Sequence, residues 1–327
     1  MAIKSFVQRV VSQPEFGPFV LLVVEIAAFS LRSPAFLSAG NISNLLAFTP
    51  ELGMITLGMT LLMTAGEFDL SVGSVFGFAP IVMWTLYNTH VASLEVGFVI
   101  ALLFAVIVGL ANGWFVTYLK IPSFLVTLGM LLVVRGTALY VTDGFPQRTW
   151  TADSPLMNIV VGEFAIGGLY IYASLLWFIL FAIILGYVLT ESKAGNWIQA
   201  AGGNPEAARA RGVRVTYTKV ALFILTAVLS AYAGITSSIR VSAANPNSGT
   251  GYELEVIAMV VIGGTALSGG RGTIIGTVVG ILILRTMRNG IVLIGVPGLA
   301  YNIFVGGIIL AMMALHSWLE RRHHAGT

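Results

Sequence analysis

The chain of 327 residues is 57% hydrophobic and only 9% charged, and its mean hydropathy is +0.91. Such a composition excludes a soluble globular protein, because the apolar side chains could not all lie in one interior, so we expect an integral membrane protein. The absence of cysteine excludes disulfides, thiolate metal sites and cysteine nucleophiles. The net charge of +3 fits an excess of basic residues on the cytoplasmic side of a membrane.

Long apolar runs, separated by short polar connections, follow one another along the chain. At roughly 20 apolar residues per span, the sequence predicts about ten transmembrane helices and an all-α integral membrane fold. We expect residues 1–327 to form a single transmembrane domain. The predicted spans lie near residues 17–31, 42–64, 70–87, 96–119, 121–141, 168–190, 220–239, 254–267, 273–294 and 299–319.

The basic residues indicate the orientation of these spans. If the N-terminus is cytoplasmic, every even-numbered connection is cytoplasmic too, and so is the C-terminus. Most of the 17 basic residues then lie on that side, as the positive-inside rule requires. They are Lys4, Arg9, Lys120, Lys193, Arg209, Arg211, Arg214, Lys219, Arg271, Arg321 and Arg322. We therefore expect a multi-pass protein with both termini in the cytoplasm.

Two pairs of similar stretches indicate an internal repeat. "GEFDLSV" (66–72) opens the third run and "TGYELEV" (250–256) opens the eighth, while "ANG" before "KIP" (111–122) is echoed by "RNG" before "GVP" (288–297). Helices 2 to 5 are therefore predicted to repeat as helices 7 to 10. An odd number of helices separates the equivalents, so the repeats are inverted, as in many transporters. Chance similarity between Gly-rich apolar stretches is the alternative.

A short charged patch lies in the connection 191–219, between the sixth and seventh runs. Asn204 can cap a helix there, and Pro205 and Glu206 suit its first turn. Alanines follow, and Gly212 ends the pattern. Two turns of helix are not stable alone in water, so we expect this helix to dock on another protein. The alternative is a basic surface loop that is attracted to anionic lipid.

Three stretches resemble the ribose-type permeases of ABC importers, the membrane subunits of ATP-driven sugar importers. "AAGGNPEAARARGVRV" (200–215) is similar to the coupling helix of that family, "AGEFDLSVGS" (65–74) to the start of its third helix, and "VIGGTALSGGRGTIIGTVVG" (261–280) to its Gly-rich connection. They occur in the family's order, and with the ten-helix plan the resemblance covers essentially the whole chain. Glu67 and Phe68 stand where the family more often has glycine and an aliphatic residue, a difference that bears on the substrate.

The resemblance implies a bacterial inner-membrane permease for a monosaccharide or a related small polar substrate. It also implies a second permease copy or paralogue, a substrate-binding protein outside and an ATP-binding subunit in the cytoplasm. ATP and Mg would be bound by that subunit, so this chain would carry no cofactor and would not be an enzyme. The residues expected to couple to the ATPase are Gly203, Asn204, Pro205, Glu206, Ala207, Arg209 and Gly212. The helix-start signature comprises Asp69, Ser71, Gly73 and Ser74.

Other site classes have little support in the residues themselves. The chain contains no G-x-x-x-x-G-K-[ST] phosphate loop, so we do not expect it to hydrolyse ATP by that route. "SGGRGT" (268–273) fits a tight turn between helices better than a phosphate-binding nest. The histidines show no metal-ligand spacing, and no nucleic-acid motif is present.

Acidic residues at the predicted helix starts have two possible roles each. Asp69, with Ser71 nearby, can cap the third helix or contact the substrate. Glu253 and Glu255 occupy the equivalent place in the second repeat, where they can cap the eighth helix or meet a docked binding protein. The external connection that follows the fifth run offers two more docking candidates, with its mixed charge. These are Asp143 and Arg148.

Several charged residues lie inside apolar runs, where a charge is costly and functional candidates are sought. Glu25 and Glu51 have no partner in their own helices, so we expect them to be protonated or hydrogen-bonded between helices. Arg135 is similar. Arg285 and Arg288 are one turn apart near an outer helix end, and we expect them to snorkel to the headgroups.

The rival hypothesis is a secondary transporter driven by protons or sodium. In it, Glu25, Glu51 and Asp69 would bind the ion between the inverted repeats. A channel is a third class that the hydropathy allows. The helix at 204–212 distinguishes these hypotheses, because neither rival has a motor subunit to receive it.

Overall fold

A computed structural model describes residues 15–149, 154–308 and 310 of the chain. The first half contains α2 (Phe16–Arg32), the 3-10 helix η1 (Pro34–Leu37), α3 (Ala39–Thr64), α4 (Val72–Asn88), α5 (Leu94–Thr117), α6 (Ser123–Val141), β1 (Gln147–Arg148) and α7 (Pro155–Val161). The rest contains β2 (Glu163–Ile166), β3 (Leu169–Tyr172), α8 (Ala173–Glu191), α9 (Lys193–Gly203), α10 (Pro205–Ala210), α11 (Val215–Val241), β4 (Ala243–Ala244), α12 (Tyr252–Ile262), α13 (Ile274–Leu293) and η2 (Gly298–Ala300).

The described part of the chain is a helical membrane protein, and a helix occupies every predicted span. Six described helices are long and apolar enough to cross a membrane: α3, α5, α6, α8, α11 and α13. The other predicted runs correspond to α2, α4, α12 and a short apolar helix at Gly298–Ile308. The N-terminus, the C-terminus and the tenth run beyond residue 310 lie outside the described residues.

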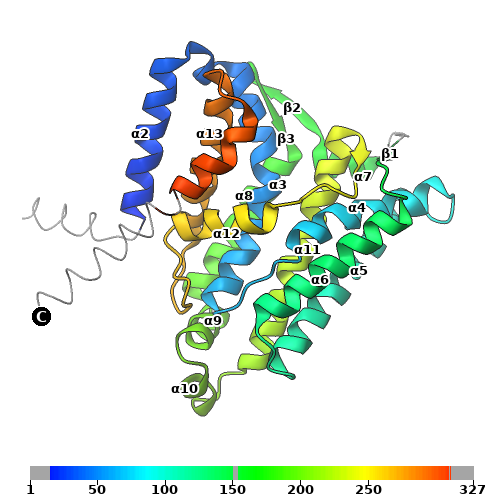
Figure 1. Ribbon diagram of the computed structural model, residues 1–327, viewed down its shortest axis with the longest axis vertical. Coiled ribbons are helices and arrows are strands. Elements are labelled where there is room, and N and C mark those ends of the chain that lie inside the picture. The colour runs from blue at the N-terminus through cyan, green and yellow to red at the C-terminus, as the bar shows by residue number, and fades with distance from the viewer. Residues whose placement is uncertain (1–14, 150–153, 309, 311–327) are drawn as a thin grey trace, which may run out of the picture.

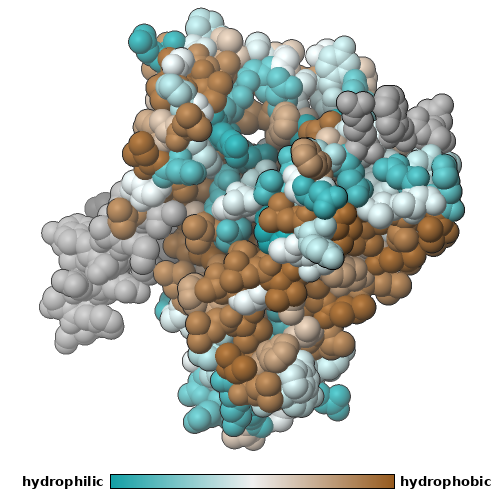
Figure 2. Space-filling view, turned by 45° about the vertical axis from the view of Figure 1, so that its right-hand side comes forward, coloured by the Kyte–Doolittle hydropathy of each residue, from teal (hydrophilic) through white to brown (hydrophobic). Residues whose placement is uncertain are grey.

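The helices run between two polar ends of the molecule (Figure 1). α9 and α10 form one end, which we call the α10 end, together with the last turn of α3 and the first turn of α11. The β2–β3 hairpin and η1 lie at the opposite end. On the face in Figure 2, apolar residues form a broad band that hydrophilic residues bound above and below. This distribution suits a protein that spans a bilayer.

The two halves of the chain are interleaved. α3, the first helix of the first predicted repeat, packs against α12 and α13 of the second. α11, the first helix of the second repeat, packs against α4 and α5 of the first. The equivalent helices are α3 and α11, α4 and α12, and α5 and α13. When each helix is replaced by its equivalent, the contacts of α3 become those of α11. α3 and α11 also contact each other. The packing is that expected for an inverted repeat.

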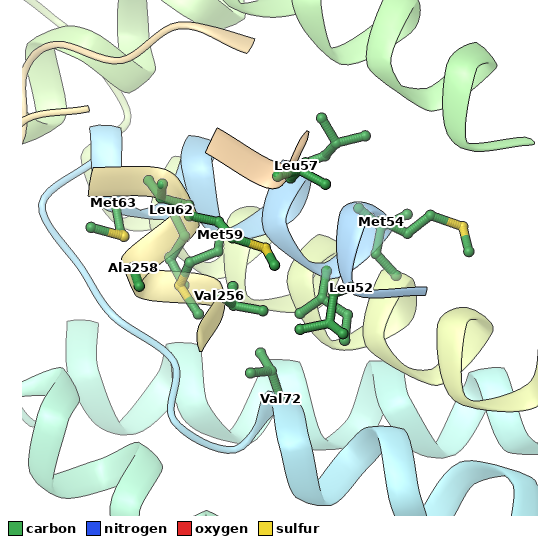
Figure 3. Packing of buried hydrophobic residues seen from close by; sticks show 14 of the residues in the cluster. Leu52, Met54, Leu57, Met59, Leu62, Met63, Val72, Val256 and Ala258 are labelled. Atoms are coloured by element: carbon green, nitrogen blue, oxygen red, sulfur yellow. The ribbon is translucent and has the colours of Figure 1, made fainter. Parts of the chain in front are cut away.

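The main core surrounds α3, whose side chains from Leu52 to Met63 are almost completely buried. Figure 3 shows Leu52, Met59 and Leu62 of this helix close to Val256 of α12. Small residues bring other helices into close contact, as at Gly109 of α5, where a Cβ would meet the backbone of α11. Close packing of this kind stabilises helices in lipid, where the hydrophobic effect gives no net gain.

One predicted span begins too early in the sequence. The run at 168–190 was predicted as helix, but the structure has a β-hairpin, β2–β3, before α8 begins at Ala173. Its turn is Gly167–Gly168, with φ of +60° and +82°. Two consecutive residues with positive φ match the twist of an antiparallel pair, so Gly-Gly was a hairpin signal. The apolar residues of β3 concealed it.

Candidate functional site

The helix predicted in the charged patch is present as α10. The Asn204 side chain accepts a hydrogen bond from the Ala207 amide at 3.0 Å, and Pro205 occupies the first turn with Glu206. Gly212 follows the helix with φ of +84°, a conformation that glycine adopts without strain. Glu206 and Ala207 are exposed, whereas Ala208 is buried against the rest of the α10 end. α10 therefore presents one face to solvent and is held by the other.

A second helix, α9, precedes α10 and was not predicted. Ser192 caps it by accepting from the Gly195 amide at 3.2 Å. Gly202 and Gly203, which directly precede the predicted helix at 204–212, lie in the last turn of α9. Two consecutive glycines at its end weaken the helical signal, because glycine is a poor helix former, so tertiary packing decides the conformation here.

Three backbone segments meet where α9 ends, and we call this the α9 junction (Thr64, Gly66, Gly202, Gly269 and Gly270). The Gly270 amide donates to the Thr64 carbonyl at 2.8 Å, which ties the α12–α13 connection to the end of α3. A Cβ at Gly202 would collide with these same two backbone groups. The Gly-rich connection thus has a structural reason for its glycines, as the tight turn predicted at 268–273 requires.

An ion pair links the α3–α4 connection to α11. Lys219 Nζ lies 2.5 Å from Glu67 Oε1, and the two side chains are only 12% and 14% exposed. Lys219 is in the second turn of α11, a few residues after α10. Glu67, one of the two departures from the family signature, therefore has a specific partner. No local sequence pattern indicates this pair, because the two residues are far apart in the chain.

Asp69 is fully buried in a polar network at the start of α4. Its Oδ1 accepts from the Ser71 amide at 2.8 Å and from the Ser71 hydroxyl at 2.5 Å. Asn112 of α5 donates to Asp69 Oδ2 at 3.3 Å and to the Ser71 hydroxyl at 3.0 Å. Asp69 thus closes the turn that precedes α4 and does not cap the helix, because Ser71 occupies the N-cap position and no side chain caps the first turn. Asn112 is an unpredicted partner, and its signal was an amide within an apolar run.

The starts of α4 and α12 lie against each other, although their equivalent motifs begin at residues 66 and 250. Phe76 and Tyr252 form an edge-to-face pair with ring centroids 5.1 Å apart. Gly73 leaves room for the Gly249 carbonyl and the Glu253 carboxylate, which a Cβ would meet. Ser74, also in the signature, is buried and donates to the Ser71 carbonyl at 2.8 Å. The repeated motifs therefore meet at the interface between the two halves.

Arg135 of α6 holds this meeting point together. Its guanidinium donates to the carbonyls of Pro246, Ser248 (2.7 Å) and Gly73 (3.0 Å). These oxygens belong to the loop before α12 and to the first turn of α4. The predicted interhelical role of Arg135 is confirmed, with backbone carbonyls as its partners.

The acidic residues within apolar runs also have interhelical partners. Glu51 of α3 pairs with Arg240 of α11, whose guanidinium stacks on the Phe48 ring at 3.8 Å from its centroid. Glu25 of α2 accepts from the Thr286 hydroxyl at 2.8 Å. The expectation of hydrogen-bonded interhelical contacts is confirmed for both carboxyl groups.

The prediction that Arg285 snorkels was wrong. Arg285 is 7% exposed, and its guanidinium donates to the Phe48 carbonyl. Phe48 lies inside α3, so this hydrogen bond ties α13 to α3 within the molecule instead of leaving the guanidinium at the membrane surface. Arg288 is half-exposed and lies 3.8 Å from Glu255, so its snorkelling stays a prediction.

The four docking candidates lie in different surroundings. Glu255 is buried and accepts from the Tyr301 hydroxyl at 2.6 Å, and Glu253 Oε2 is buried at the α4–α12 interface. Glu255 is therefore not presented at the surface in this conformation, whereas Glu253 is partly exposed. Asp143 is exposed. The backbone of Arg148 pairs with Ala243 in the β1–β4 sheet, and its side chain lies outside what the structure describes.

No group of three or more potential metal ligands occurs among the described residues. A family model described as the permease component of a branched-chain amino acid transport system matches residues 41–313. The chain belongs to this permease family. The match spans the helices from α3 onward, so it includes α10, the α9 junction and the Asp69 network.

Relatives of this permease are import permeases for sugars. The ribose import permease protein of Bacillus subtilis (strain 168) is 36% identical over 319 residues, which are 95% of this chain and 94% of that protein. The ribose import permease protein of Escherichia coli (strain K12) is 35% identical over 298 residues, or 90% and 91%. The galactose/methyl galactoside import permease protein of Salmonella typhimurium is 33% identical over 316 residues, or 93% and 94%. No solved structure matches the permease.

Proposed function

We propose that this chain is the membrane-spanning subunit of an ABC importer that carries a monosaccharide or a related small polar substrate. The sugar class is supported by relatives that are named as import permeases for ribose and galactose. The ATP-driven mechanism rests on α10, an exposed, fully capped helix on the polar end of a membrane protein. A helix of six residues has no stability of its own, so an exposed face of this kind suits a partner protein.

The connection 191–219 transmits force in this proposal. α9 packs through Gly202 on the backbone of Thr64 and Gly270, and Lys219, after α10, holds Glu67. A movement of α10 therefore acts directly on the ends of α3, on the α12–α13 connection and on the segment before α4. Glu206, Arg209 and the cap residues would contact the ATP-binding subunit, while Asp69 and Ser71 would keep the start of α4 rigid.

The proposed importer also fixes the orientation of the chain and its other partners. The α10 end is cytoplasmic, both termini share that side, and the opposite end faces the compartment outside the inner membrane. A substrate-binding protein would dock there, with exposed Asp143 as a candidate contact. A second permease copy or paralogue would complete the pathway, and ATP and Mg would be bound by the ATP-binding subunits.

The rival ion-coupled mechanism gains no support from the site. Glu51 pairs with Arg240, Glu25 accepts from Thr286, and Asp69 is held by Ser71 and Asn112. Each carboxyl group thus has at least one partner within the protein, and Glu25 Oε2 is the buried oxygen of these groups that has none among the described residues.

Reconstitution tests the proposal. The permease would be purified with its retained partners and placed in lipid vesicles, and uptake of radiolabelled ribose, xylose and galactose would be measured. We expect uptake only with the binding protein and with ATP at the α10 side. Uptake of these sugars driven by a proton or sodium gradient without ATP would contradict the proposal.

A further inference from the structure

A cleft of about 580 Å³ lies beside the α10 end, between the end of α5 and the segment that joins α10 to α11. It is separate from the Asp69 network and from the exposed Glu206. The residues that matter for its chemistry are Leu110, Trp114 and Tyr118 of α5, Arg209 of α10, and Arg214 and Tyr217 at the start of α11.

The walls of the cleft are polar toward the α10 end and apolar toward the middle of the molecule. Leu110 lies one turn deeper in α5 than Trp114, and Val220 of α11 lines the same region. Trp114, Tyr118 and Tyr217 are 46%, 64% and 70% exposed. Exposed tryptophan and tyrosine at one end of apolar helices mark the level of lipid headgroups. The cleft therefore spans the boundary between headgroups and hydrocarbon.

Two guanidinium groups border the polar part of the cleft. Arg209 and Arg214 are exposed, and neither has a carboxylate within ion-pair distance among the residues that the structure describes. Arginine binds phosphate with paired hydrogen bonds, and basic pockets between membrane helices bind anionic headgroups. An acyl chain would extend past Leu110 and Val220, while a neutral or cationic ligand would leave both charges uncompensated.

We infer that this cleft binds one anionic phospholipid, with the phosphate on Arg214 and an acyl chain along α5, while Arg209 at the rim stays available to the ATP-binding subunit. The lipid would occupy the membrane side of α10 and leave Glu206 free on the other side. It would link α5 to the start of α11 and so hold the base of α10 at a fixed depth in the membrane. An anionic lipid would thereby become a structural component of the α10 end.

The test measures lipid binding in the purified full-length chain with its retained partners. Native mass spectrometry would compare phosphatidylglycerol with phosphatidylcholine of the same acyl chains, in wild type, Arg214→Gln and Arg211→Gln. Arg211 is a matched control, since it is exposed in the same segment but does not line the cleft. We expect wild type to retain phosphatidylglycerol preferentially and Arg214→Gln to bind it about fivefold more weakly, the effect of one basic residue at an anionic surface.

A second readout does not depend on arginine. Brominated phosphatidylglycerol should quench tryptophan fluorescence in wild type, and less so in Trp114→Phe. The inference is wrong if both arginine variants weaken binding equally, if phosphatidylcholine is retained as well, or if Trp114→Phe leaves quenching unchanged. Loss of the ATP-binding subunit from Arg214→Gln, with phosphatidylglycerol retention intact, would assign the cleft to that subunit. Failure of lipid binding would leave the importer proposal standing, because subunit retention is measured separately.

Discussion

Lys219 and Glu67 form a largely buried ion pair that joins the start of α11 to the segment before α4. The pair connects α10 to the Asp69 network, because Lys219 follows α10 in the chain and Glu67 precedes the turn that Asp69 closes. Removing one member of a buried pair leaves the other charge without compensation, which costs more than the pair itself contributes. The two residues therefore have to be considered together.

We expect Lys219→Ala and Glu67→Ala each to destabilise the protein by about 3 kcal/mol. The exchanged pair, Glu67→Lys with Lys219→Glu, should recover most of this loss, since the charges remain adjacent. Thermal unfolding in detergent measures the stability, and ATP-dependent uptake measures the coupling. An exchanged pair as unstable as the sum of its single variants would contradict a direct interaction.

The α9 junction can be tested with two neighbouring glycines. A Cβ at Gly202 would meet the backbone of Thr64 and Gly270, whereas a Cβ at Gly203 would lie 3.8 Å from its nearest neighbour, the Cα of Gly270. Gly202→Ala should therefore cost roughly 1–3 kcal/mol through overpacking, and Gly203→Ala should leave the melting temperature nearly unchanged. Equal melting temperatures for both variants would show that α9 is not packed as described.

The Asp69 network predicts a graded effect of two substitutions. Asp69→Ala leaves the Ser71 amide and hydroxyl without their acceptor in a buried site, at a cost of about 1–3 kcal/mol. Asp69→Asn retains one oxygen for Ser71 and should be less harmful. Thermal unfolding of the purified variants gives the comparison, and a more damaging Asn than Ala variant would overturn the assigned hydrogen bonds.

Glu25 provides the test of ion coupling. Glutamine at this position keeps an oxygen that can accept from Thr286 but cannot carry a transported proton. We expect Glu25→Gln to import sugar with ATP at the wild-type rate, and uptake by both proteins to persist when a protonophore removes the gradient. Abolished uptake in this variant, together with protonophore-sensitive uptake in wild type, would favour the secondary transporter.

Local sequence signals predicted the parts of the fold that depend on local physics. Apolar length located the helices, and the Asn204, Pro205 and Gly212 pattern located α10, because caps and apolar runs act over a few residues. The α9 helix was missed, since its glycines are explained by contacts with Thr64 and Gly270 from distant segments.

Arg285 was misassigned for the same reason. Its guanidinium donates to the Phe48 carbonyl of α3, and Glu255 accepts from the Tyr301 hydroxyl. Neither partner is near in sequence, and one sequence contains no signal that pairs them. Single-chain patterns therefore predicted which residues carry charge into the membrane, but not which of those charges reach solvent.

The central claim is that α10 receives a motor subunit, and co-purification tests it most directly. The tagged chain would be purified from its native membranes in mild detergent, as wild type, Glu206→Lys and the control Glu191→Lys, an exposed acidic residue just before α9. Mass spectrometry would identify retained proteins. We predict an ATP-binding subunit with wild type and Glu191→Lys but not with Glu206→Lys. Retention of that subunit by all three proteins, or by none while the chain alone transports on an ion gradient, would contradict the account.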